Sequence, residues 1–153
     1  MADLQDRHET HDQHAENSST FGAFFLHEVD NLLKAMGYEK KPEDDWLFGF
    51  CVQKIDEQIQ NACNVPRIPH GLNKTAIGLM AAEFLLIKLS SGQNSGLESL
   101  NFEPIVKQLQ EGDTNIVYAV DPAISDSAQF ALYLNSLKTA AQGQFVSYRR
   151  LKW

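Results

Sequence analysis

One stretch, Leu72 to Leu89, constrains the fold of this chain more than any other. It reads LNKTAIGLMAAEFLLIKL and is apolar on almost every side, with Glu83 and Lys88 as the charges that interrupt it beyond its first turn. A helix that is hydrophobic all round cannot lie on a surface, because a large apolar area would remain in water. We therefore expect it at the centre of a helix bundle or buried by neighbouring subunits.

Three other segments repeat apolar residues at helical spacing and are predicted to cover this central helix. The first is a helix over 21–36 that stops at Gly37, and the second starts at Pro42, with acids in its first turn, where the helix dipole favours them. The third is capped by Ser125 and is expected to end at Gly143. The expected buried stripes are Phe21, Phe25, Val29, Leu32 and Met36; Phe48, Cys51, Val52, Ile55, Ile59 and Ala62; and Phe130, Tyr133, Leu134, Leu137 and Ala141.

The pattern changes between the third and the last of these helices. A short helix is predicted over 102–110, and the turn signal Glu111-Gly112-Asp113 leads into TNIVYAV, which is β-branched and alternating. A single strand leaves its backbone donors and acceptors unpaired. We therefore expect a β-hairpin or extended strand near 112–120 that pairs within the hairpin or with an adjacent subunit, and the residues predicted at that interface are Thr114, Ile116, Val117 and Tyr118.

The predicted fold class is all-α: a bundle of four to five helices, with that hairpin or strand and with extended terminal arms. A length of 153 residues is typical of one domain. We expect a polar N-terminal arm over 1–20, a helical domain over 21–143 and a basic, aromatic tail over 144–153. Residues 1–20 contain almost nothing that can be buried, so their composition predicts a disordered or weakly helical arm.

Charge and hydropathy exclude several classes of protein. The formal net charge of −7 argues against nucleic acid as the bound ligand. Residues 1–20 carry five acids and one base, whereas residues 142–153 carry three bases and no acid. No apolar run reaches the roughly 18 residues of a membrane helix. The N-terminus also lacks the basic flank and apolar stretch of a signal peptide, so an intracellular site is expected.

The residues that carry chemistry do not form a convincing active site. Cys51 and Cys63 lie roughly 18 Å apart along one predicted helix, too far for a mutual disulfide. They are interpreted as buried, reduced thiols. A pairing of either cysteine with His27 or His70 is disfavoured as a nucleophile, because an apolar stripe raises the pKa of a thiol.

Metal, nucleotide and acid–base sites are also disfavoured. His8, His11 and His14 recur every three residues, but a polar arm offers no rigid scaffold for a metal, so a solvated face is preferred. The pairs Asp44-Asp45 and Asp56-Glu57 are typical of helix-start charge and of a solvated surface. Glu83 either makes a subunit contact or reaches solvent or a backbone donor, and the second interpretation is favoured. No glycine motif for phosphate is present, so no catalytic, metal or cofactor site is predicted.

Two further features exceed what a self-contained domain needs. Trp46 and Phe50 are neighbours on the side of their helix opposite the apolar stripe, so we expect the N-terminal region or a partner to cover them. The chain ends in Tyr148-Arg149-Arg150-Leu151-Lys152-Trp153, which is rich in the residue types most enriched at interface hot spots. The alternative for this ending is a frayed basic terminus.

Several segments, in the same order, are similar to the head–tail connector (neck adaptor) proteins of tailed bacteriophages, as found in phages and prophages of Gram-positive bacteria. The resemblance covers roughly residues 45–153, and its most specific parts are Gln110-Glu111-Gly112-Asp113-Thr114 and the Tyr-Arg-Arg-x-x-Trp ending. The matching segments are FCVQKIDEQIQNACNVPRIP (50–69), Gly71-Leu72, Ala82-Glu83-Phe84-Leu85, VKQLQEGDTNIV (106–117) and the last six residues. An N-terminal arm of this length and polarity departs from the family.

The resemblance implies a non-enzymatic subunit of a virion neck. Such a subunit forms a homo-oligomeric ring, expected to be twelve-fold, between the phage portal protein and the next neck or tail completion protein. DNA passes through the lumen without specific binding, which suits an acidic channel, and no cofactor is needed. The tail is the segment expected to reach the portal. The alternative is a small helical regulatory or protein-binding module of phage or host, and a hydrolase is disfavoured because no nucleophile–base pair is present.

Overall fold

The computed structural model describes residues 6–93, 97, 100–101 and 126–151, and within them the chain is mainly helical. No strand occurs in this part of the chain, and the all-α class is confirmed. The excursion at 112–120 and the short helix predicted over 102–110 lie outside the described residues. The elements are α1 (Asp6–Ala35), η1 (Pro42–Asp44), α2 (Asp45–Cys63), η2 (His70–Leu72), α3 (Asn73–Ser90) and α5 (Asp126–Tyr148), where η marks a short 3₁₀ turn.

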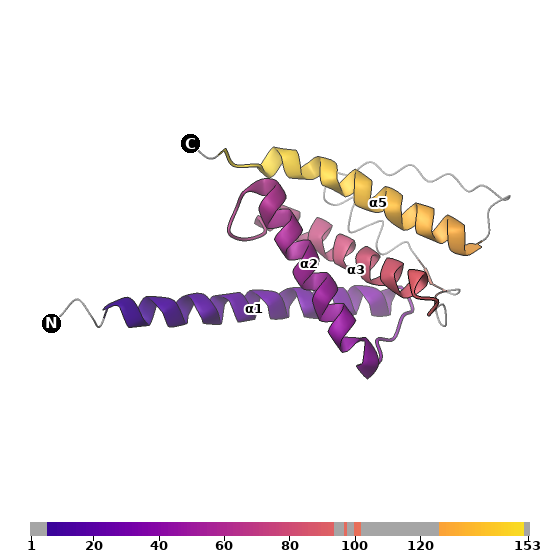
Figure 1. Cartoon of the computed structure of the whole chain (residues 1–153), viewed down its shortest axis with the longest axis horizontal. Coiled ribbons are helices and arrows are strands. Elements are labelled where there is room, and N and C mark those ends of the chain that lie inside the picture. The colour runs from indigo at the N-terminus through magenta and orange to yellow at the C-terminus, as the bar shows by residue number, and fades with distance from the viewer. Residues whose placement is uncertain (1–5, 94–96, 98–99, 102–125, 152–153) are drawn as a thin grey trace.

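The apolar helix α3 is central, as its sequence predicts. It packs against α1, α2 and α5 (Figure 1), and every residue from Thr75 to Leu85 is buried. Phe84 forms T-shaped contacts with two aromatic rings, with its centroid 5.6 Å from that of Tyr38 and 5.7 Å from that of Phe48. Edge-to-face contacts of this kind favour one relative orientation of the rings, in addition to the stabilisation from burying their apolar surface.

Helix α1 is longer than the sequence pattern indicates. Its apolar stripe agrees with the prediction, since Phe25, Val29, Leu32 and Met36 are buried. It ends at Ala35, shortly before the expected stop at Gly37, whose φ of 93° is left-handed. The prediction of an extended N-terminal arm is wrong for residues 6–20, which continue the same helix. That segment contains no glycine or proline, and Ser18, Ser19 and Thr20, whose residue types favour helix caps, are only slightly unfavourable inside a helix.

Helix α2 buries the stripe that its sequence predicts, with one exception at its C-terminal end. Ala62 is exposed and Cys63 is buried in its place. The reason is a change of neighbour, because here the helix meets α5: the thiol of Cys63 lies 3.6 Å from the carbonyl oxygen of Phe145 and donates to it. The stripe therefore turns toward α5 at its last residue.

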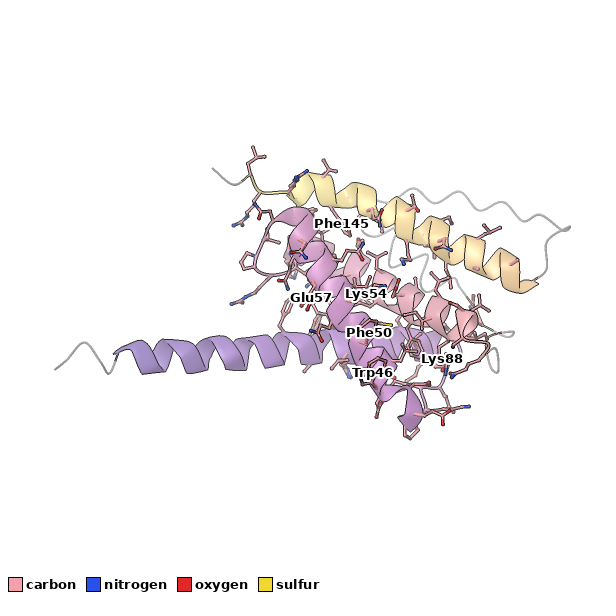
Figure 2. The ribbon with its side chains drawn as sticks, in the orientation of Figure 1. Trp46, Phe50, Lys54, Glu57, Lys88 and Phe145 are labelled. Carbon is pink, nitrogen blue, oxygen red and sulfur yellow. The ribbon has the colours of Figure 1, made fainter. Side chains whose placement is uncertain are left out.

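Helix α5 passes the glycine that was expected to end it. Leu134, Leu137 and Ala141 are buried as predicted, but the helix continues through Gly143 to Tyr148. Phe145, assigned from sequence to the tail, extends the stripe and is also buried (Figure 2). Burying such a side chain stabilises by about 1.5–3 kcal/mol. That exceeds the roughly 1 kcal/mol by which glycine disfavours a helix, so packing decides the boundary.

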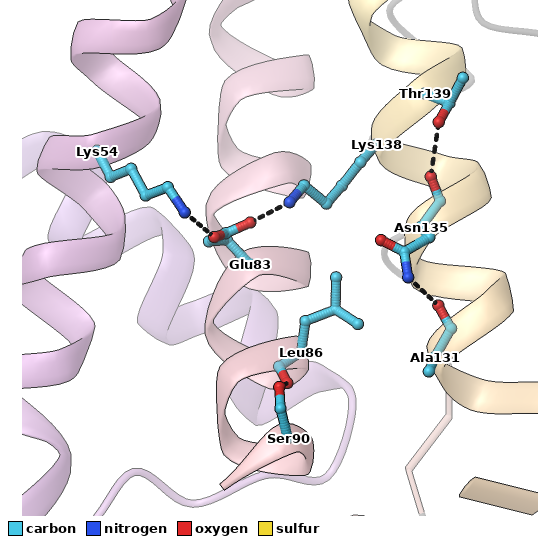
Figure 3. Close-up of polar contacts among 8 residues, drawn as sticks. All are labelled: Lys54, Glu83, Leu86, Ser90, Ala131, Asn135, Lys138 and Thr139. Carbon is cyan, nitrogen blue, oxygen red and sulfur yellow. Dashed lines mark hydrogen bonds and ion pairs between the residues drawn. The ribbon is translucent and has the colours of Figure 1, made fainter. Parts of the chain in front are cut away.

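A buried carboxylate links α2, α3 and α5. Glu83 of α3 has a side chain only 5% exposed, and it accepts hydrogen bonds from Lys54 of α2 and Lys138 of α5 (Figure 3). The sequence favoured a Glu83 whose head reaches solvent or a backbone donor, and that interpretation is wrong. A charge on the middle of a fully buried helix is satisfied by opposite charges from its neighbours.

A second buried network joins η1 to the end of α3. Asp44, interpreted from sequence as part of a solvated helix start, is 3% exposed. Its carboxylate accepts from the hydroxyl of Tyr38 at 2.8 Å, from the backbone N–H of Lys41 at 3.0 Å and from Lys88 Nζ at 2.6 Å. Lys88 also donates to the side-chain oxygen of Gln93 at 2.6 Å. Burial and then the bond to Asp44 raise the pKa of Tyr38, so its hydroxyl stays protonated as the donor.

The Glu83 cluster makes the stability of the bundle depend on pH. Burial alone would raise the pKa of Glu83, but the hydrogen bonds from Lys138 and Lys54 and their positive charges outweigh it, and the pKa is lowered from 4.5. A carboxyl whose pKa is lower in the folded chain stabilises it above the unfolded pKa. That contribution is lost as the pH falls through the folded value.

Replacing Glu83 with Gln is expected to lower the free energy of unfolding by about 1–3 kcal/mol near neutral pH. The lower part of that range is favoured, because the side chain of Lys54 is 46% exposed and can turn to water. The difference from the wild type should shrink at an acidic pH below the lowered pKa of Glu83, where the carboxyl is protonated in the folded chain. Urea unfolding at both pH values measures this, with the exposed Glu57→Gln as a control that should change stability by less than about 0.5 kcal/mol. An equal loss at both pH values would contradict the assignment.

Candidate protein-interaction surfaces

Trp46 and Phe50 form an exposed aromatic pair at the start of α2. Their rings are stacked, with centroids 5.5 Å apart and planes within 10° of parallel. Trp46 is 76% exposed and Phe50 44%, so in the single chain neither ring is covered (Figure 2). The cover that the sequence predicts from the N-terminal region is not found among the described residues. Large aromatic rings held this way in water favour burial against a partner.

The same face of α2 becomes polar one turn further along. Gln53 and Glu57 follow Phe50 at helical spacing, and Gln53 Nε2 donates to Glu57 Oε1 at 3.0 Å. Lys54 lies beside them, and its ammonium group forms an ion pair with the carboxylate of Glu83. An aromatic centre with a polar edge is the usual anatomy of a protein interface. The pair and its polar continuation can therefore serve as one contact surface.

The C-terminal segment lies on the other end of α2. The backbone N–H of Arg150 donates to the carbonyl oxygen of Cys63 at 2.8 Å, and Asn64 Nδ2 donates to the carbonyl oxygen of Arg150 at 3.0 Å. The prediction of an extended C-terminal arm is therefore wrong as far as Arg150, because residues up to Tyr148 belong to α5 and Arg150 is bound to the end of α2. The last carbonyl groups of a helix have no partner within it, and Arg150 supplies one of the missing donors.

Asn64 has the backbone conformation that this contact requires. It caps α2 in the left-handed region, with φ 54° and ψ 50°, and its N–H donates to the carbonyl of Gln60. After glycine, asparagine is one of the residues that tolerate this left-handed conformation best. One residue thus ends the helix and holds the tail.

Tyr148 docks beside this cap. A Cβ atom added at Gly71 would overlap the hydroxyl oxygen of Tyr148 and come within 2.9 Å of its Cζ. The absence of a side chain at Gly71 lets the ring lie against η2. In contrast, the side chains of Arg149 and Arg150 are exposed, and Leu151 is 71% exposed. The backbone of the tail is held while these three side chains stay available.

The thiols are poorly suited to nucleophilic chemistry. Burial, together with the charge of Glu83, raises the pKa of Cys51 to about 12, and burial also raises the pKa of Cys63. The expected effect of the apolar stripe on Cys51 is confirmed. Among the described residues, no group of three or more histidine, cysteine and carboxylate side chains is placed to hold a metal ion. The side chains of His8, His11 and His14 lie outside the described part.

The predicted interface residues divide into two separate surfaces. Trp46 and Phe50 lie near one end of α2 and Arg149–Leu151 near the other, about 26 Å away at the usual rise per residue. Sequence reasoning missed the residues that receive the tail, Asn64 and Gly71. Their signal was an asparagine at the end of an apolar stripe and a glycine after two prolines. The predicted residues Lys152, Trp153, Thr114, Ile116, Val117 and Tyr118 lie outside the described residues.

Comparison of the chain with protein-family models, with curated proteins and with solved structures gave no match. In the described part of the chain, no helix combines the length and apolar character of a membrane span.

Replacing Asn64 with Gly is expected to loosen the tail while keeping the end of α2. Glycine adopts the left-handed conformation without strain, so the change removes the bond to the Arg150 carbonyl and little else. Because one such bond contributes about 1 kcal/mol, trypsin cleavage after Arg149 and Arg150 should rise about fivefold. Mass spectrometry of timed digests measures this, with cleavage after Lys40 as the internal reference. Unchanged cleavage at the tail would show that Asn64 does not hold it.

Proposed function

We propose that this chain is a structural, non-catalytic head–tail connector subunit, which assembles as a ring in the neck of a tailed-phage virion. The observation that carries the proposal is the pair of exposed surfaces at opposite ends of α2. A subunit that stands between other proteins needs surfaces that face different ways, and the aromatic pair and the anchored tail provide them. The similarity of residues 45–153 to connector proteins supports the same function.

In this proposal each surface has its own partner. The stacked pair Trp46 and Phe50 meets a neighbouring subunit, where burying both rings would make them an interface hot spot. The tail meets the portal protein through its last residues, 151–153. The remaining expected elements belong to the proposal as well: a hairpin or strand at 112–120 pairs between subunits, and a further neck or tail completion protein binds the opposite side.

The core suits a part whose function is geometric. The Glu83 and Asp44 networks join α2, α3, α5 and η1 through buried charged groups, which have few alternative arrangements. A subunit that holds its shape can repeat the same angle around a ring, expected to be twelve-fold. The net charge of −7 is compatible with a lumen that repels phosphate and lets DNA pass. No cofactor takes part.

Removing residues 151–153 is expected to leave a folded subunit that binds portal at least tenfold more weakly. The truncated chain keeps Arg150 and its bonds to Cys63 and Asn64, but it loses Leu151, Lys152 and Trp153, and an aromatic anchor of an interface contributes about 2 kcal/mol or more. Pull-down with the portal protein encoded in the same genome measures binding. Leu132→Ala is the control, because Leu132 is 58% exposed on α5 and lies outside the tail.

Electron microscopy of phage particles, labelled with antibodies against this chain, tests the location. Label at the head–tail junction is expected. Particles labelled elsewhere, or a chain found only outside particles, would favour a regulatory or binding module of the same helical type. Undiminished portal binding by the truncated chain would show that the tail is not the portal contact.

A further inference from the structure

One end of the bundle combines arginines with a local absence of acidic residues. Residues 58–82 and 127–153 contain no aspartate or glutamate, although the whole chain has 20 acids against 13 lysines and arginines. These two segments meet where Arg150 bonds to Cys63 and Asn64. Three of the four arginines of the sequence lie here, and we call Arg67, Arg149 and Arg150 the basic pole.

The basic pole is held in position while its side chains are free of the core. All three arginines are exposed. Arg149 and Arg150 are positioned by the backbone bonds of the tail, and Arg67 lies three residues after Asn64 in the same turn. The fork of an arginine matches a carboxylate with two parallel hydrogen bonds. Fixing the backbone beforehand lowers the entropy lost on binding, so this arrangement favours a partner that displays several carboxylates.

The same chain carries an acidic segment that matches this requirement. Between Asp6 and Thr20, α1 has four acids and a single arginine. Three of the acids, Glu9, Asp12 and Glu16, are spaced by three and four residues, which places them at neighbouring positions along one face of a helix. Figure 1 shows the start of α1, drawn in indigo, projecting beyond the other helices. A projecting helix can reach a second molecule.

We infer that the start of α1 of one copy docks on the basic pole of a second copy. This contact is heterologous, because it joins two different surfaces, and contacts of that kind produce rings when the rotation between copies closes. This contact rests on the proposed function, because a connector subunit has to assemble as a ring. A phosphate backbone is the less suitable ligand, because the net charge of −7 repels it whereas a helix of the same chain supplies carboxylates.

Charge-reversal variants that repair each other test the contact. Variant P carries Arg149→Glu and Arg150→Glu, and variant N carries Glu9→Lys and Asp12→Lys. Each alone should self-associate at least about tenfold more weakly than the wild type, since like charges then face each other. Mixed in equal amounts, they should associate again to within about threefold of the wild type, because the acidic helix of P meets the intact pole of N. Sedimentation equilibrium at low salt gives these constants, and circular dichroism verifies that each variant is folded.

The control is Lys34→Glu with Lys41→Glu, which changes the net charge by the same amount as variant P away from the basic pole. It should leave self-association within about threefold of the wild type, and about 0.5 M salt should weaken the wild-type contact strongly. A wild type that stays monomeric at low salt up to about 1 mM would overturn the inference, and so would a mixture of P and N that fails to associate. Duplex DNA that binds the wild type and not variant P would make the pole a phosphate site instead. Antibody labelling of particles tests the proposed function separately, because it does not depend on this contact.

Discussion

The arrangement of the bundle depends on how one buried charge is satisfied. Glu83 lies on a helix with no polar side of its own, so its carboxylate must find partners on whatever packs against it. Lys54 and Lys138 meet that demand from two different helices, and the observed register of α2 and α5 brings both to the same carboxylate. Apolar side chains in these places would give comparable stability. The triad therefore contributes chiefly to specificity, by selecting one packing among many that would bury α3 equally well.

Much of the fold follows from the sequence because it depends on periodicity. The central place of α3 and the stripes of α1, α2 and α5 were predictable, because the apolar residues that each helix buries can be recognised from their spacing in its own sequence. The boundaries were less predictable. Gly143 and the serines before Phe21 are strong local signals for an end and a start, yet packing of Phe145 and an uninterrupted helix-forming segment outweigh them. Local signals of about 1 kcal/mol lose to tertiary contacts of two or three.

The candidate surfaces were predictable in one case and not in the other. The outward position of Trp46 and Phe50 follows from counting residues around a helix. The docking of the tail does not, because it joins Arg150 to Asn64 across 86 positions of sequence, as the Glu83 contacts join residues 29 and 55 apart. Contacts between distant segments are fixed by the packing of the helices between them. A sequence shows which residues need a partner, such as a charge in an apolar helix, without showing which partner they obtain.

The buried networks also explain how the surface charge is distributed. Lys54, Lys88 and Lys138 are held by Glu83 and Asp44, so three bases of the central region contribute little to the outer field. The remaining charge is then unequal between the start of α1, which is acidic, and the end of the bundle around Asn64, which is basic. A rigid subunit with opposite charges at separate places attracts copies of itself in one orientation. The Glu83 network joins α2 and α5, the two helices whose ends meet at the basic end, so the packing that satisfies the core also positions the arginines of the proposed self-association.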